Sequence, residues 1–193
     1  MSSHTPLRGI RVLTLALNLP GPAAVMRLKA MGATCTKFEP LAGDGGSGDP
    51  MSRYRPQAYE HMHLGTKVVA ADLKAPSGQK KLHALLQKTD VLITSFRPSA
   101  LKKLGLDPTT LARIYPSLVQ VSIVGAPGAL AEEPGHDLTY MALSGSLSRV
   151  GDGHAPPPVA AEARARARMR CVSCSACGIS SPWYTHTFTP MTP

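Results

Sequence analysis

The segment from Asp90 to Asp107 restricts the fold more than any other part of the sequence. Val91–Ile93 is a short apolar run between polar residues, and this pattern predicts a buried strand. Pro98 stands at the first position of a predicted helix, which Gly105 ends. A second helix is expected directly afterwards, with Asp107 as its N-cap. A strand that opens through a loop into a helix is the repeating unit of α/β proteins.

The same order of strand and helix recurs along the first two thirds of the chain. Its alternation down to about residue 124 predicts an α/β fold: a mainly parallel, Rossmann-like sheet with flanking helices, followed by an irregular C-terminal tail. The loop 18–22 lacks the GxGxxG pattern of dinucleotide-binding dehydrogenases. The predicted strands are 10–16, 34–38, 68–71, 91–93 and 118–124, and the predicted helices include 23–31, capped by Gly32, and 77–88.

Two loops carry arginines that could meet an anion. Arg97 lies between a predicted strand and a predicted helix, a place that favours a phosphate, although an ordinary loop with a solvated arginine fits the same pattern. Residues 41–56 are rich in Gly, Asp, Ser and Pro and are expected to form a mobile loop over the sheet edge. Arg53 or Arg55 could close from it on a bound anion, or the loop could be a flexible surface connection.

Charge and hydropathy narrow the choice of partner. The 193-residue chain has a net charge of +9, and residues 160–193 hold four arginines and one glutamate, so the rest is only mildly basic. Such a charge suits a phosphorylated small molecule. No basic groove interleaved with aromatic residues is present in the sequence, so no specific nucleic-acid partner is expected. No segment approaches the ~20 apolar residues that cross a bilayer, and the N-terminus has no signal-peptide pattern; we expect a cytoplasmic protein.

His136 is a candidate catalytic residue because it opens a predicted helix that runs to Leu143 and ends at Gly145. The positive end of a helix lowers the pKa of a histidine and favours the neutral imidazole, which can act as a base. A plainer interpretation fits as well: Asp137 stabilises the first turn of the helix and His136 is solvated.

Several of these segments, taken in order, resemble the family III CoA-transferases of the CaiB/BaiF type, which include formyl-CoA transferase and α-methylacyl-CoA racemase. PLRGIRVLTLALNLPGPAAVMRLKAMGATCTKFEP is similar to the family's opening motif. The resemblance continues through GTKVVAADLKAPSGQKKLHALLQKTDVLITSFRPSALKKLGL to PGHDLTYMALSGSL. It covers residues 6–150, which are expected to form a CoA-binding Rossmann-like domain.

The resemblance implies roles for five residues. Lys37 and Lys67 would contact the phosphates of coenzyme A, and Phe96 with Arg97 would border its nucleotide end; a cationic side chain suits a multiply phosphorylated ligand. His136 aligns with the histidine that serves as acid and base in the racemase branch. Coenzyme A or an acyl-CoA would be a substrate and not a permanently bound cofactor, and two chains would interlock as a homodimer.

The sequence departs from the family after residue 150. The family's transferases use an aspartate that becomes a covalent acyl anhydride, whereas here no aspartate follows Asp152, which itself precedes the Pro-rich turn. The family's members are also about twice as long. Residues 151–193 are therefore predicted to be a divergent tail, either disordered or the product of a reading-frame shift just after Val159, and the chain is expected to be truncated.

The tail also contains a metal-like spacing, Cys171-x-x-Cys174-x-x-Cys177 with His186 nine residues on. This spacing is compatible with zinc or an iron–sulfur cluster. The surrounding alternation of Ala and Arg has no apolar period, which favours the tail without a metal.

The sequence thus predicts a family III CoA-transferase that acts on acyl-CoA thioesters, moving CoA between carboxylic acids, with its catalytic aspartate absent. Two alternatives stay open. One is proton transfer of the α-methylacyl-CoA racemase type through His136, and the other is a non-catalytic remnant that binds CoA. The sequence leaves open whether this chain is an active enzyme; we expect weak CoA binding and little turnover.

Overall fold

The computed structural model describes residues 5–42, 46–144 and 169–171. Six strands form one sheet in the order β3-β2-β1-β4-β5-β6, in which the first five are parallel and β6 is antiparallel to β5. The strands are β1 (Arg11–Thr14), β2 (Thr34–Glu39), β3 (Lys67–Ala70), β4 (Val91–Thr94), β5 (Val119–Ile123) and β6 (Met169–Cys171). The predicted α/β fold, a mainly parallel sheet with flanking helices, is confirmed.

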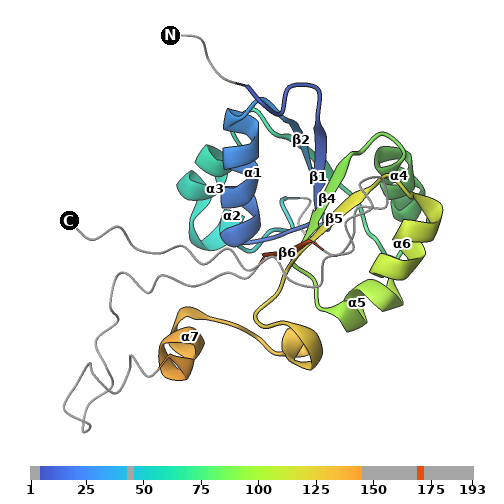
Figure 1. The fold of residues 1–193 in the computed structure, drawn as a ribbon. Helices are drawn as coiled ribbons and strands as arrows, with labels where there is room; N and C mark the ends of the chain where they lie inside the picture. Colours follow the sequence, from blue (N-terminus) through green and yellow to red (C-terminus); the bar gives the residue numbers. More distant parts are fainter. Residues whose placement is uncertain (1–4, 43–45, 145–168, 172–193) are drawn as a thin grey trace, which may run out of the picture.

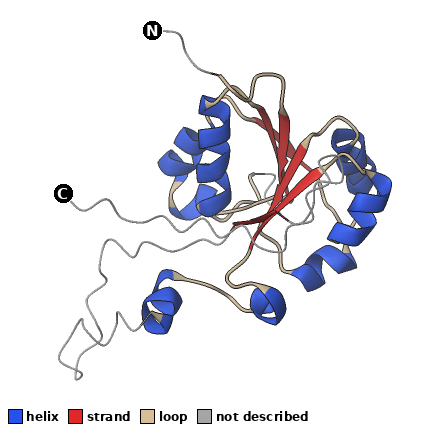
Figure 2. Cartoon of the chain, in the orientation of Figure 1, coloured by secondary structure: helices blue, strands red, loops and turns tan. Residues whose placement is uncertain are grey.

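Helices cover both faces of this sheet (Figures 1 and 2). The group α1–α3 lies on one side and the group α4–α6 on the other, while η1 and α7 follow the end of β5. Among the described helices, none combines the length and the apolar character needed to span a bilayer. The helices are α1 (Pro20–Ala30), α2 (Met51–Tyr54), α3 (Pro56–His63), α4 (Pro76–Leu86), α5 (Pro98–Lys103), α6 (Pro108–Ile114), the 3₁₀ helix η1 (Gly128–Glu132) and α7 (Asp137–Leu143).

Local sequence signals set most of the helix ends. α1, α3, α4, α5 and α6 each begin with a proline, whose missing N–H is not needed in the first turn. Asp107 caps α6 by accepting the backbone N–H of Thr110 at 3.0 Å. Gly32 and Gly105 follow α1 and α5 in the left-handed conformation, with φ of 99° and 68°. The caps predicted at Gly32, Gly105 and Asp107 are therefore confirmed.

The two faces of the sheet are filled differently. Between the sheet and α4–α6 lies an almost wholly aliphatic cluster, which we call the α4–α6 core. A smaller apolar cluster packs between the sheet and α1. The α4–α6 core comprises Leu13, Leu15, Phe38, Ala71, Leu73, Leu82, Leu86, Leu92, Leu101, Leu106, Leu111 and Leu118, and the smaller cluster comprises Val12, Ala16, Val25, Ala33, Cys35 and Ile93.

Two predictions about elements need correction. α1 begins at Pro20 and not at residue 23, because Pro20 and Pro22 both fall in the first turn, where no intrahelical N–H bond is required. The mobile loop predicted for 41–56 is wrong for its last part, which contains α2 and a fully buried Asp49. Within the predicted tail, residues 169–171 form β6, which pairs with β5. The rest of the tail, with Cys174, Cys177 and His186 of the Cys/His spacing, lies outside the described residues.

Candidate functional site

The carboxyl ends of β1 and β4 form the topological switch point of the sheet. From β1 the chain proceeds outward to β2 and β3, whereas β4 and β5 extend the sheet in the opposite direction. Open α/β sheets bind their ligands in the crevice at such a point, outside the carboxyl ends of the strands. Two segments border it here, residues 15–19 after β1 and residues 95–97 after β4, and we call them the switch-point loops.

The two switch-point loops are tied to each other and to the start of α1. The backbone N–H of Leu17 donates to Ser95 Oγ at 3.2 Å. Gly21, in the first turn of α1, lies so close to Ala16 that an added Cβ would stand 2.2 Å from the Ala16 Cβ. Asn18 adopts φ of 61°, the left-handed region that few residues other than glycine enter. The predicted break at 18–22 is thus a tight turn at residues 18–19 that leads directly into α1.

Arg97 is the cation at the second switch-point loop. It is exposed and stands at the N-cap of α5, beside a half-buried Phe96 that packs on the α4–α6 core. The carboxylate of Glu132 in η1 accepts from Ser99 N at 2.7 Å and from Ser99 Oγ at 2.8 Å. The first turn of α5 therefore already holds an anion, which belongs to the chain itself, and Arg97 is the group that remains exposed at this loop.

A buried cluster of charges lies behind the first switch-point loop. Lys37, Glu39, Asp49 and His63, which we call the Lys37 cluster, are all buried, and the first three are 0% exposed. The Lys37 ammonium pairs with Asp49 and, at 3.1 Å, with Glu39 Oε1, and it lies 2.8 Å from His63 Nε2. Tyr59 and Ser47 donate their hydroxyl hydrogens to Glu39. The cluster thus joins β2, α3 and the segment before α2.

Hydrogen bonds set the tautomer of His63 in the Lys37 cluster, and burial shifts the pKa values of His63 and Tyr59. His63 Nδ1 lies 2.6 Å from the carbonyl oxygen of Tyr59, which can only accept, so Nδ1 carries the hydrogen and Nε2 accepts from Lys37. Burial is the main cause that lowers the pKa of His63, and it keeps the imidazole neutral. Burial, followed by the hydrogen bond to Glu39, raises the pKa of Tyr59 to about 12.

The Lys37 cluster has the donor set of a metal site but holds a cation of its own. Donor atoms of Glu39, Asp49 and His63 lie within 4.8 Å of one another, as the ligands of a divalent ion would. The Lys37 ammonium lies between these donor atoms and contacts Glu39, Asp49 and His63. The position that a metal ion would occupy is therefore taken by this side chain.

The structure places the predicted site residues in different settings. Lys37 is enclosed in its cluster, so its predicted phosphate contact would require the ion pairs to open. Lys67 is exposed at the amino end of β3, level with Thr36, whereas Arg97 follows the carboxyl end of β4, three strands (about 14 Å) across the sheet. His136 is exposed at the N-cap of α7, where its backbone N–H lies 3.5 Å from Thr139 Oγ1. These side chains are not brought together around one point.

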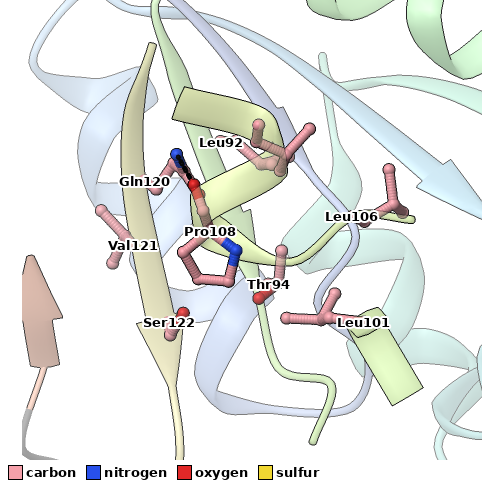
Figure 3. A pocket seen from close by; sticks show the side chains of 9 residues that line it. Leu92, Thr94, Leu101, Leu106, Pro108, Gln120, Val121 and Ser122 are labelled. Carbon is pink, nitrogen blue, oxygen red and sulfur yellow. Dashed lines mark hydrogen bonds between the residues drawn. The ribbon is translucent and has the colours of Figure 1, made fainter. Parts of the chain in front are cut away.

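A small cavity lies between the sheet and α5–α6 (Figure 3). Its volume is about 10 Å³, roughly the space of one water molecule. Buried Thr94 lines it with a hydroxyl that has no hydrogen-bond partner, and the neighbouring Gln120 donates from Nε2 to the Pro108 carbonyl at 3.2 Å. A cavity of this size cannot accept a coenzyme, and the candidate site is therefore assigned to the switch-point loops from the topology of the sheet.

Comparison with known proteins identifies the family. The model of CoA-transferase family III matches residues 7–167, most of the chain. The chain belongs to CoA-transferase family III. The family predicted from the sequence motifs is thereby confirmed.

The relatives of this family III chain carry out different reactions. It is 34% identical over 155 residues to α-methylacyl-CoA racemase of Mus musculus, covering 79% of this chain and 37% of the relative. It is 35% identical over 167 residues to succinate–glutarate CoA-transferase of Agrobacterium fabrum, covering 79% and 41%. The crystal structure of a CaiB/BaiF family protein from Brucella suis superposes with a TM-score of 0.70 at 29% identity, covering 83% and 44%. The chain spans about two fifths of the length of these curated relatives.

Sequence reasoning missed the residues that shape the first switch-point loop. Asp49 lies in a Gly- and Asp-rich segment that gave no local sign of burial, although Gly48 beside it approaches Pro40 so closely that an added Cβ would stand 2.1 Å from the Pro40 oxygen. Asn18 and Ser95 were not singled out either. One usable signal was present: Lys37 and Glu39 share a strand face with apolar Cys35, a pattern that favours a buried ion pair.

Proposed function

We propose that this chain binds coenzyme A and acyl-CoA thioesters at the switch-point loops, as the nucleotide-holding part of a family III protein that transfers CoA between carboxylic acids. The observation that carries the proposal is the family match over residues 7–167. The position of the switch-point loops in the sheet supports this binding site independently, because open α/β sheets bind their ligands at such a point.

In this proposal Arg97 pairs with a phosphate of coenzyme A. Its guanidinium is always charged and presents a planar fork of donors that matches phosphate oxygens. Its exposure at the open end of β4, beside Phe96, supports this role. Lys67 stays a proposed phosphate contact for another part of the ligand, since it lies at the far edge of the sheet. Lys37 could reach a phosphate only if its ion pairs opened.

Transfer of CoA also requires a nucleophile, and the proposal assigns this chain little turnover. The covalent aspartate that the family resemblance implies has no counterpart after Asp152. Binding without turnover is therefore the expected behaviour of the 193-residue chain. The proposed macromolecular partner is a second copy of the chain, as the resemblance implies.

Proton transfer at the carbon next to the thioester is a second candidate. The observation that favours it is the 34% identity to a relative named α-methylacyl-CoA racemase, together with an exposed His136 at the start of α7. A neutral imidazole in that position could remove the α-proton of a bound acyl-CoA. Exchange of the α-hydrogen of 2-methylacyl-CoA with deuterium, lost in His136→Ala, would distinguish this reaction from CoA transfer.

Calorimetric titration with coenzyme A tests the binding proposal. The wild-type chain is expected to bind, and Arg97→Ala is expected to weaken binding about tenfold because one charge-assisted contact is lost. Arg113→Ala is the matched control, since Arg113 is an exposed arginine of α6. Absence of any heat with coenzyme A and acetyl-CoA would contradict the proposal, as would an equal effect of the two substitutions.

A further inference from the structure

We propose that Asp49 is a positioning residue of the crevice: its buried carboxylate, held in place by Lys37, fixes the backbone of Asn18 in the first switch-point loop. The consequence for coenzyme A rests on the proposed function, whereas the effect on the loop itself does not. Neither the sequence motifs nor the family match assigns this role to Asp49.

The unusual conformation of Asn18 requires a stabilising contact. A φ of 61° is disfavoured for residues other than glycine, although asparagine tolerates it better than most. Asp49 supplies the contact: its two carboxylate oxygens lie 3.1 and 3.3 Å from Asn18 N, and Oδ1 also accepts from Met51 N at 2.9 Å. One carboxylate therefore joins the loop after β1 to the first turn of α2.

The carboxylate of Asp49 is held in turn by a cation. Asp49 is 0% exposed, and a buried carboxylate is stable only when it is paired and hydrogen-bonded. Lys37 provides the pair, and its ammonium is itself oriented by Glu39 and His63, which approach from β2 and α3. The position of Asp49, and with it the position of Asn18, is thus set by β2 and α3 rather than by the loop alone.

Neither Asp49 nor Lys37 can touch a ligand in this conformation, because both side chains are fully buried. Asn18 is exposed and lies at the switch point. A change at Asp49 would therefore reach a bound ligand through the position of Asn18. Tyr54 holds the same residue from the other end of α2, since its hydroxyl donates to Asn18 Oδ1 at 3.3 Å. The geometry therefore assigns the Lys37 cluster an indirect role in the crevice.

The test compares Asp49→Ala, Asp49→Asn and Leu86→Ala in the full chain. Alanine removes the acceptor, whereas asparagine keeps one carbonyl oxygen in a side chain of nearly the same shape. Leu86 is 1% exposed in the α4–α6 core, so its truncation lowers stability on the opposite face without touching Asn18. Two readouts are used: amide hydrogen exchange at Asn18 relative to Leu17, whose N–H bonds to Ser95, and the affinity for coenzyme A.

The expected result for Asp49→Ala is exchange at Asn18 about tenfold faster relative to Leu17, and affinity for coenzyme A about tenfold weaker. Asp49→Asn should retain only part of the protection at Asn18, because a neutral amide keeps one acceptor oxygen but loses the ion pair with Lys37. Leu86→Ala should leave the Asn18 to Leu17 ratio and the affinity unchanged at a temperature where all variants are folded.

Equal ratios in Asp49→Ala and Leu86→Ala would overturn the positioning role, because the effect would then be one of general stability. If Asp49→Ala does not fold, the ratio in Asp49→Asn decides: an unchanged ratio together with unchanged affinity overturns the role, and a raised ratio supports it. Absence of coenzyme A binding by the wild-type chain would refute the proposed function, while the exchange ratio would still decide whether Asp49 holds the loop.

Discussion

The two faces of the central sheet are packed with different kinds of side chain. The α4–α6 core is a continuous aliphatic cluster, whose attraction is non-directional and depends mainly on the area removed from water. The α1–α3 face instead combines a smaller apolar cluster with the buried charges of Lys37, Glu39 and Asp49. Such charges are a weak source of net stability, because desolvation opposes their attraction.

The difference shows which face of the sheet determines the geometry of the first switch-point loop. An aliphatic core can repack around a changed side chain, whereas each bond of the Lys37 cluster has one partner and one direction. The only link from either face to the Asn18 backbone that we identify in the described residues is through Asp49. The charged face therefore holds Asn18 of the first switch-point loop, whereas the aliphatic face supports the fold and packs beneath Leu15 and Phe96 of the two loops.

Removal of the buried Lys37 ammonium should lower the free energy of unfolding more than truncation in the aliphatic face does. Lys37→Ala leaves Glu39 and Asp49 buried without their cation, and we expect a loss of about 3–5 kcal/mol in the free energy of unfolding. Urea unfolding measures it. Lys67→Ala is the control, since an exposed lysine at the start of β3 should change stability by less than ~0.5 kcal/mol. A loss below 1 kcal/mol for Lys37→Ala would show that water reaches the cluster.

Truncation in the aliphatic face should cost nearly as much stability but spare the site. For Leu86→Ala we expect a loss of about 3 kcal/mol from the lost burial and the resulting cavity. Thermal unfolding gives the stability and calorimetry the coenzyme A affinity. A fall in affinity that matches that of Asp49→Ala would mean that the two faces are not separate in function.

A cap on the surface of the aliphatic side should have a smaller effect. Asp107→Ala removes the acceptor for Thr110 N–H at the start of α6 and is expected to lower the free energy of unfolding by less than Leu86→Ala does. Asp107→Ser, which retains a capping oxygen, should recover most of the loss in the same urea experiment. Equal losses in the two variants would contradict the capping role.

The smallest expected effect is a pH dependence of the charged face. Burial lowers the pKa of His63 below its ordinary value of 6.5, so below pH 6.5 the unfolded chain takes up a proton that the folded chain resists. Stability should therefore fall as the pH decreases from 6.5 toward the lowered pKa. Thermal unfolding between pH 7.5 and 5.5 measures this slope, which should be shallower in His63→Gln. If the substitution leaves the slope unchanged, a group other than His63 causes the pH dependence.

The sequence predicted the elements whose signals are local. Pro98, Gly105 and Asp107 mark the ends of α5 and α6 because proline, glycine and aspartate act through their own backbone and its nearest neighbours. The parallel sheet followed from the regular alternation of strands and helices. The family motifs, which lie within residues 6–150, predicted the family that the match over residues 7–167 confirms.

The contacts that shape the site depend on distant parts of the chain and had no local signal. Asp49 is buried because Lys37 of β2 and His63 of α3 meet it in space. For the same reason a Gly- and Asp-rich segment, which by composition favours a loop, contains α2. Lys37 was predicted as a phosphate contact from its charge and its place in a motif; neither reveals that two carboxylates enclose it.

Mapping of coenzyme A onto the backbone amides tests the central claim most directly. A titration followed by ¹H–¹⁵N correlation spectra should shift the amides of residues 15–19 and 95–99 first and most strongly, since they border the switch point of the sheet. Amides of α4, on the outer side of the aliphatic core, should not move. Shifts confined to other parts of the chain, or no shifts at millimolar coenzyme A, would contradict the account.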